Sequence, residues 1–263
     1  MRKITSVVLF LCLMWATLVM VSCTKTPLPL TPAPVVQPIA KPVDLTAIAR
    51  GSQCAARSWK DRGKAPIGYF IGVAHSYARA LCKPPGNASA ALGSPEKDAL
   101  AHYGFLKAPE TDKARLKATY LMVIGLGLRE STGNFTCGRD YTAKGPQSAS
   151  TGETGAWQFS FDSINATKEF KEIYAYYQAH PSECLKKEYS EGVKLKDNGY
   201  IGEGPGLAFQ KFMRSCPAAQ AEYTASGIRV LRKHWGPINR KEVELPEECT
   251  EMLTEIENAV VCS

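Results

Sequence analysis

Apolar residues recur at helical spacing along most of this chain, whereas glycines, prolines and polar residues gather between the apolar stretches. Apolar residues three to four positions apart are typical of amphipathic α-helices. The pattern therefore predicts a mainly α fold (α+β) with only a small β or loop region. We expect helices over 46–82, from 94, from a cap at Thr111 or Asp112 to 130, and over 161–179, 207–215, 218–233 and 247–261.

Two polar stretches interrupt the helical pattern. Residues 133–153 contain Gly, Ser, Thr and Asn with little apolar matter, which predicts a loop with at most a short hairpin. Residues 199–206 are rich in glycine and predict a second loop, which we expect to border a binding cleft.

The first residues have a different character. Arg2 and Lys3 precede an apolar run over 7–21, which is the pattern of a secretory signal peptide. This run is short for a membrane-spanning helix, which needs about 20 residues. Ser22 stands directly before Cys23, as at the processing site of bacterial lipoproteins. We therefore expect a lipid on Cys23, with a plain signal peptide or a retained membrane anchor as the alternatives.

A proline-rich tether follows the expected lipid site. Residues 24–45 contain six prolines, favour extended geometry and span roughly 70 Å. Thr24, rather than Asp, follows Cys23, which by resemblance to Gram-negative lipoproteins implies the outer membrane. The expected protein is thus secreted across the inner membrane, lies in the periplasm and is held at the outer membrane through Cys23.

Cysteine usage fits the oxidising compartment that a secretory signal implies. Without Cys12 and Cys23, seven cysteines remain, so three disulfides would leave one residue over. If Cys23 carried no lipid the number would be eight, and this parity argues mildly against lipidation. Neither Cys-x-x-Cys nor His-Glu-x-x-His occurs, so we expect no metal and no cofactor. Our working hypothesis for the disulfides omits Cys137 and pairs Cys54–Cys82, Cys184–Cys216 and Cys249–Cys262.

Glu130 is the most informative candidate for chemistry. It ends the apolar segment 121–130 and directly precedes the polar loop. Apolar neighbours and the negative end of the helix dipole both disfavour a charged carboxylate, so we expect its pKa to be raised. A carboxyl that keeps its proton near neutral pH is the general acid that glycosidic bond cleavage needs. The competing interpretation is a glutamate that caps the helix or pairs with a cation beside Arg129.

Two short motifs around Glu130 resemble the catalytic core of the lysozyme superfamily. They are Glu-Ser-Thr-Gly at 130–133 and Thr-Gly-Ala-Trp-Gln-Phe-Ser at 154–160. The pattern is most similar to goose-type lysozymes and lytic transglycosylases and covers roughly 114–235. In those families Glu-Ser ends a buried helix, a small β region follows, and Gly-x-x-Gln opens the next helix beside the sugar cleft. The Tyr-Asn-Ala-Gly segment of lytic transglycosylases has no clear copy here, so the product chemistry stays open.

The resemblance implies a second carboxylate in the loop, which positions water in goose-type enzymes. Glu153 matches the spacing better than Asp140. A distance of ~6.5–9.5 Å from Glu130 would suit water attack with inversion, and ~5–5.5 Å would suit a retaining route. Without a second acid, Glu130 would act alone while the sugar's own 6-hydroxyl attacks. The residues expected to bind sugar are Gln158 through its amide and Trp157, Tyr141 and Tyr200 through their rings.

The sequence therefore predicts a muramidase that cleaves the β-1,4 bond between N-acetylmuramic acid and N-acetylglucosamine, in ordinary or de-acetylated peptidoglycan. A lytic transglycosylase and a non-catalytic peptidoglycan-binding lipoprotein stay open as alternatives. The net charge of +7 suits glycan strands with peptide carboxylates, and no Lys/Arg run indicates nucleic acid. The expected parts are a signal peptide (1–22), a lipid site with its tether (23–45), a helical cap (46–113), a lysozyme-like core (114–240) and a helical tail (241–263).

Overall fold

Helices dominate the computed structural model of this protein, which describes residues 43–82, 94, 96–105, 111–139, 147–195 and 199–262. The predicted mainly α class is therefore confirmed. The short 3-10 helices are η1 (Phe161–Asn165), η2 (Pro181–Glu183) and η3 (Arg232–His234). The α-helices are α1 (Leu45–Gly51), α2 (Gln53–Ala56), α3 (Ile67–Cys82), α5 (Ala99–His102), α6 (Asp112–Ser131), α7 (Lys168–Ala179), α8 (Lys186–Ser190), α9 (Gly204–Ser215), α10 (Pro217–Val230), α11 (Gly236–Asn239) and α12 (Glu247–Ala259).

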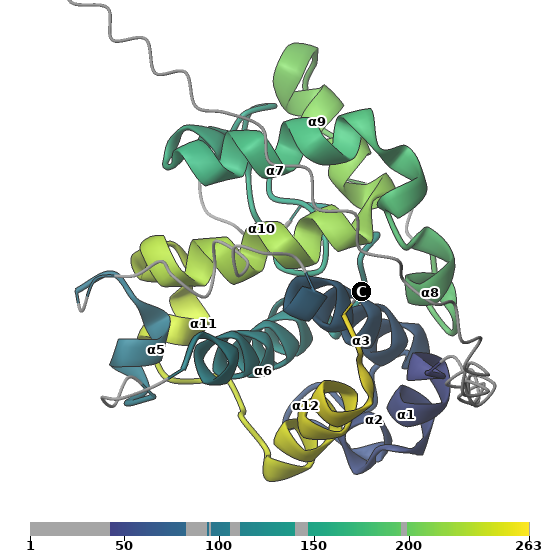
Figure 1. Cartoon of the computed structure of the whole chain (residues 1–263). Helices are drawn as coiled ribbons and strands as arrows, with labels where there is room; N and C mark the ends of the chain where they lie inside the picture. The colour runs from purple at the N-terminus through teal and green to yellow at the C-terminus, as the bar shows by residue number, and fades with distance from the viewer. Residues whose placement is uncertain are drawn as a thin grey trace, which may run out of the picture. The chain divides into compact units, whose positions relative to one another are not determined.

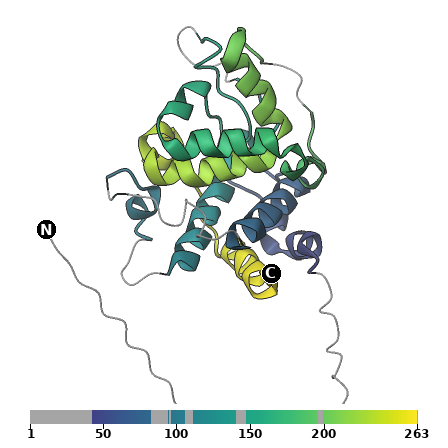
Figure 2. The same cartoon turned by 45° about the horizontal axis from the view of Figure 1, so that its top comes forward.

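Three helices, α3, α6 and α10, lie at the centre of the unit Pro42–Ser263 and contact one another. α7 and α9 pack on α10, whereas α1 and α12 pack on α3, and α12 also contacts α6 (Figure 1). The turned view shows α7 running along α10 (Figure 2). The predicted cap over 46–113 and tail over 241–263 therefore pack directly on the predicted core.

α6 begins and ends close to where the sequence predicts. Its first turn is capped by Thr111, whose hydroxyl accepts a hydrogen bond from the backbone N–H of Ala114 at 3.1 Å. At its other end Thr132 is left-handed with φ 59°, and the N–H of Gly133 donates to the carbonyl of Gly127 at 3.0 Å. The helix therefore stops one residue after Glu130.

Two of the predicted helices are interrupted. The stretch 46–82 breaks between α2 and α3, where Asp61 and Gly63 both adopt positive φ in a tight turn. The stretch 161–179 divides into η1 and α7, because the hydroxyl of Thr167 accepts from the N–H of Phe170 at 3.3 Å and starts a new helix there. Local capping and turn geometry override the apolar periodicity in both places.

The predicted β region is smaller than expected. Within the described ranges the only β pairings are isolated bridges, Trp59 with Gly63 and Thr154 with Phe159. The second bridge closes the Thr-Gly-Ala-Trp-Gln-Phe motif into one tight turn. Gln158 has φ 50° in that turn, so it does not open a helix as the resemblance implied.

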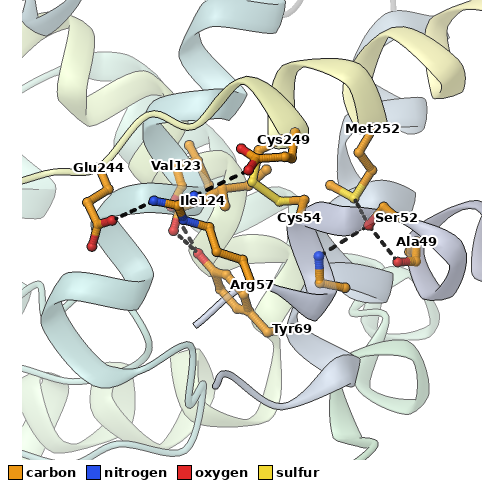
Figure 3. The surroundings of a disulfide bond; sticks show 12 residues. Ala49, Ser52, Cys54, Arg57, Tyr69, Val123, Ile124, Glu244, Cys249 and Met252 are labelled. Atoms are coloured by element: carbon orange, nitrogen blue, oxygen red, sulfur yellow. Dashed lines mark hydrogen bonds and ion pairs between the residues drawn. A yellow bond between two sulfur atoms is a disulfide. The ribbon is translucent and has the colours of Figure 1, made fainter. Parts of the chain in front are cut away.

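Three disulfides connect the chain, and only one of the expected pairs is correct. Cys184–Cys216 forms as predicted, and Cys137 belongs to none of the three. The other two predicted pairs are wrong, because Cys54 bonds Cys249 and Cys82 bonds Cys262. Packing of α12 against α2 and α3 brings these distant cysteines together. Figure 3 shows the bridge between Cys54 and Cys249.

Salt bridges reinforce the same contact. Arg57 binds Glu244 at 3.1 Å, close to the bridge of Cys249 (Figure 3). It also binds Glu248 at 3.4 Å. The tail is thus joined to the N-terminal helices by covalent and ionic contacts together.

Three predicted site residues, Cys23, Asp140 and Tyr141, lie outside the described residues. None of the helices in the described part of the chain is both long and apolar enough to cross a bilayer.

Candidate active site

Glu130 is the second-last residue of α6 and is half-buried at the start of the loop that follows. The preceding residues from Leu121 to Leu128 are all buried, so the carboxyl stands at the end of an apolar helix. Glu130 forms no hydrogen bond and no ion pair with any residue that the structure describes. Its carboxyl is therefore not occupied by a structural contact.

Burial is the largest cause that raises the pKa of Glu130 from its ordinary value of 4.5 to about 7, and the charge of Glu153 contributes to the same rise. Arg62, Arg240 and Arg129 act in the opposite direction. The pKa effect of Glu153 shows that the two carboxyls belong to one electrostatic site. Near neutral pH, Glu130 consequently keeps its proton in a large share of molecules, as a general acid must.

Arg129 forms ion pairs with other residues, which argues against the interpretation that Glu130 is a structural glutamate paired with a neighbouring cation. Its guanidinium contacts Glu242 at 3.3 Å and Asp61 at 3.8 Å. Glu242 also binds Arg240 at 2.7 Å. Arg129 and Arg240 are thus held by Glu242 and Asp61, and the pKa of Glu130 stays raised.

No family model, curated protein or solved structure matches this chain. The assignment of the site therefore rests on the two sequence motifs and on the geometry around Glu130.

The motif turn lies directly against α6. A Cβ atom at Gly127 would come within 2.4 Å of the Tyr69 hydroxyl and 2.7 Å of the Trp157 indole nitrogen, so only glycine permits this approach. The indole N–H of Trp157 donates to the carbonyl of Val123 at 2.8 Å, and its ring is fully buried. The predicted sugar-stacking role of Trp157 is therefore wrong, because the ring is part of the core that attaches the turn to α6.

Gln220 on α10 forms hydrogen bonds with the other side of this turn. It was not among the residues predicted from the sequence. Its side-chain oxygen accepts from the N–H of Ala156 at 2.7 Å, and its nitrogen donates to the carbonyls of Phe135 at 3.0 Å and Met213 at 2.6 Å. The side chain is completely buried. A glutamine within the apolar face of a predicted helix was the signal that could have identified it.

Gln220→Leu is expected to lower the free energy of unfolding by about 2–4 kcal/mol, because buried backbone groups would lose their partners at about 1–3 kcal/mol each. Urea denaturation at pH 6 measures the change. Gln178→Leu on the exposed face of α7 is the matched control and should stay within about 0.5 kcal/mol of the wild type. Equal stability of the two variants would contradict the fastening role.

A second buried glutamine, Gln210 on α9, holds the stretch before Glu153. Its nitrogen donates to the carbonyls of Ala149 at 2.9 Å and Ile201 at 3.2 Å, and its oxygen accepts from the N–H of Ile201 at 3.1 Å. The loop after 199 is thereby joined to the turn that precedes Glu153. This arrangement gives the second carboxyl a fixed backbone.

The remaining sugar-binding candidates have different surroundings. Gln158 is buried, and its amide nitrogen donates to the carbonyl of Gly155 at 2.7 Å within its own turn. Tyr200 keeps 39% of its surface exposed, and the Arg214 guanidinium lies 4.1 Å from its ring centre. Tyr200 therefore has an accessible ring, whereas the amide of Gln158 is committed to the turn.

Two further aromatic residues belong to the core. Tyr223 stacks on Phe170 and shares a hydrogen bond with Ser163 at 2.7 Å. The indole N–H of Trp235, next to the short helix η3, donates to the carbonyl of Trp157 at 3.2 Å.

In the part of the chain that the structure describes, no group of three or more His, Cys, Asp or Glu residues is placed to hold a metal ion.

Proposed function

We propose that this protein is a peptidoglycan glycosidase of the muramidase type, in which Glu130 is the general acid. The observation that carries the proposal is the carboxyl of Glu130, which has a pKa of about 7, no structural partner among the described residues and a second carboxyl near enough to affect it. Most glycosidases use two carboxyl groups in different environments for catalysis.

The proposed reaction divides the two proton transfers between these acids. Protonated Glu130 gives its proton to the glycosidic oxygen as the bond from that oxygen to the anomeric carbon breaks. The carboxylate of Glu153 accepts a proton from water, whose oxygen bonds to the anomeric carbon. The products are a new reducing end and a new hydroxyl on the leaving sugar. The electrostatic link of Glu153 to Glu130 favours this hydrolytic route over attack by the sugar's own 6-hydroxyl.

The lysozyme-like assignment has two supports. One is the pair of motifs at 130–133 and 154–160. The other is the close packing of the second motif on the catalytic helix, through the contacts of Trp157 with Gly127 and Val123. A bond between amino sugars in a glycan strand is the substrate that such a site would take, and neither a metal nor an organic cofactor enters the reaction as proposed.

We also infer a lipoprotein of the outer membrane, held through Cys23 and a proline-rich tether. The apolar run over 7–21 and the Ser-Cys pair at 22–23 support this location. The three disulfides of the folded unit fit an oxidising compartment. Incorporation of labelled palmitate, lost in Cys23→Ser, tests the lipid directly.

Mass spectrometry of soluble products from sacculi tests the activity. Native and chemically de-acetylated sacculi are each incubated with the mature protein and with Glu130→Gln. Reducing-end muropeptides that disappear in the variant are the expected result, and the better substrate identifies the acetylation preference. If the products were anhydro-muropeptides instead, the reaction would be that of a lytic transglycosylase and not hydrolysis. Absence of products from both substrates would contradict the glycosidase and favour a binding lipoprotein.

A further inference from the structure

A cavity of about 390 Å³ with mixed polar and apolar walls opens beside the end of the helix that carries Glu130. Its wall includes Ser131 and Thr132, the two residues that follow Glu130, and its size falls within the usual range for ligand sites. A larger hollow of about 700 Å³ is lined by residues near η2, α8 and the end of α9, and by none of the residues around Glu130. Of these two cavities in the described part of the chain, the smaller one adjoins the proposed chemistry.

Two cations face this cavity from segments far apart in the sequence. Lys64 comes from the connection between α2 and α3, and Lys194 comes from the loop after α8. Both side chains are exposed, and neither forms an ion pair with a described residue. Nearby carboxylates are engaged elsewhere, since Glu191 binds Arg50 and Asp61 contacts Arg129.

The backbone that carries both lysines is held in place. The buried amide of Asn134 donates to the carbonyl of Lys194 at 2.9 Å, and the N–H of Gly68 donates to the carbonyl of Glu191 at 2.9 Å. The turn before Lys64 is closed by the N–H of Trp59, which donates to the carbonyl of Gly63 at 2.9 Å. Asn134 also lines the cavity, so the site combines two ammonium groups with neighbouring hydroxyl and amide groups.

This combination suits a carboxylate. An ammonium group binds carboxylate oxygens through charge-assisted hydrogen bonds, and the Thr132 hydroxyl can donate to the same oxygens, whereas the Ser131 hydroxyl already donates to the carbonyl of Gly127 at 3.2 Å. Muramic acid is the sugar of peptidoglycan that carries such a group, either on the peptide attached to its lactyl ether or on the lactyl group itself once the peptide is removed. Every cleavage point in the glycan adjoins a muramic acid.

We propose that Lys64 and Lys194 form a carboxylate subsite that recognises the acidic substituent of muramic acid next to the bond that Glu130 cleaves. The inference rests on the proposed function for the identity of the glycan. The subsite would make the protein prefer glycan with acidic substituents over an uncharged β-1,4 amino-sugar chain.

Binding measurements on a Glu130→Gln background test the subsite without any turnover. Three ligands are compared by calorimetry: glycan with its peptides, the same glycan after removal of the peptides by an amidase, and an uncharged chitin oligosaccharide. Lys64→Gln with Lys194→Gln is compared with Lys171→Gln, which removes one exposed lysine from α7 instead. Circular dichroism confirms that each variant is folded.

The double variant is expected to bind the peptide-bearing glycan about three- to tenfold more weakly, as for the loss of two exposed ion pairs, and to bind chitin oligosaccharide unchanged. If the same loss persists after amidase treatment, the lactyl carboxylate is the group recognised; if it disappears, the peptide carboxylate is. Equal affinities of the double variant and Lys171→Gln for all three ligands would overturn the subsite. Whether the protein is a glycosidase is decided separately, by the release of soluble products from sacculi by the wild type.

Discussion

Glu130→Gln is expected to lower the rate of glycan cleavage by about 10²–10⁴-fold, since a positioned general acid contributes about that much. The glutamine keeps the size of the side chain and cannot give a proton to the leaving oxygen. Release of reducing ends from sacculi measures the rate at pH 6. A control variant, Glu255→Gln on the exposed face of α12, should match the wild type. Activity in Glu130→Gln within about threefold of the wild type would remove Glu130 from the reaction.

The same substitution is expected to stabilise the folded protein at high pH. The folded state holds the Glu130 proton more tightly than the unfolded chain, because its pKa is about 7 instead of 4.5. The carboxyl therefore costs almost nothing below pH 4.5, becomes increasingly destabilising as the pH rises from 4.5 to 7, and has its full effect above pH 7. The full difference corresponds to roughly 3 kcal/mol, and partial exposure of the side chain reduces it to about 1–3 kcal/mol.

Urea denaturation at two pH values measures this effect. At pH 8 the free energy of unfolding of Glu130→Gln should exceed that of the wild type, and at pH 4 the two should agree. An equal offset at both pH values would mean that the glutamine acts through packing and not through ionisation of the carboxyl.

Replacing Cys54 and Cys249 by serine should lower the free energy of unfolding by about 2–5 kcal/mol. The bridge joins residues 195 positions apart, so its loss releases a very long loop in the unfolded chain. It also fixes the position of α12, which packs on α6, the helix that carries Glu130. We therefore expect activity to fall at a lower temperature in the variant than in the wild type, and thermal unfolding followed by circular dichroism measures the shift.

The bridge Cys184–Cys216 gives the internal comparison. It encloses 32 positions, and loop-closure entropy predicts that its loss costs about 1–2 kcal/mol less than loss of the longer bridge. If removal of the short bridge were the more damaging change, packing around Cys184 would outweigh the closure of the long loop.

The parts of the fold that local sequence governs were predictable. Apolar spacing identified the long helices. Thr111 marked the start of α6, because capping of a first helical turn by a hydroxyl depends only on the local sequence. Glu130 could be found for the same reason, since its raised pKa depends on the buried helix that precedes it. The polar loop after it also followed from composition.

Features that depend on contacts between distant segments were not predictable. Our disulfide hypothesis joined cysteines that are neighbours along the chain, whereas the packing of α12 decides two of the three pairs. The position of Trp157 in the motif suggested a ring that stacks on sugar. Because Gly127 has no side chain, the Trp157 ring packs closely against α6 and lies inside the core. Gln220 was missed because its three partners lie in three separate parts of the chain.

The disulfide pattern has a consequence for the export that we propose for this protein. A secreted chain emerges from its N-terminal side, so Cys54 and Cys82 reach an oxidising compartment well before their partners, Cys249 and Cys262. During that interval each can react with the other, and only 28 positions separate them. Correct oxidation must therefore wait for the end of translocation or depend on an enzyme that reshuffles bridges. We expect the yield of native protein in the periplasm to depend on a disulfide isomerase as well as on an oxidase.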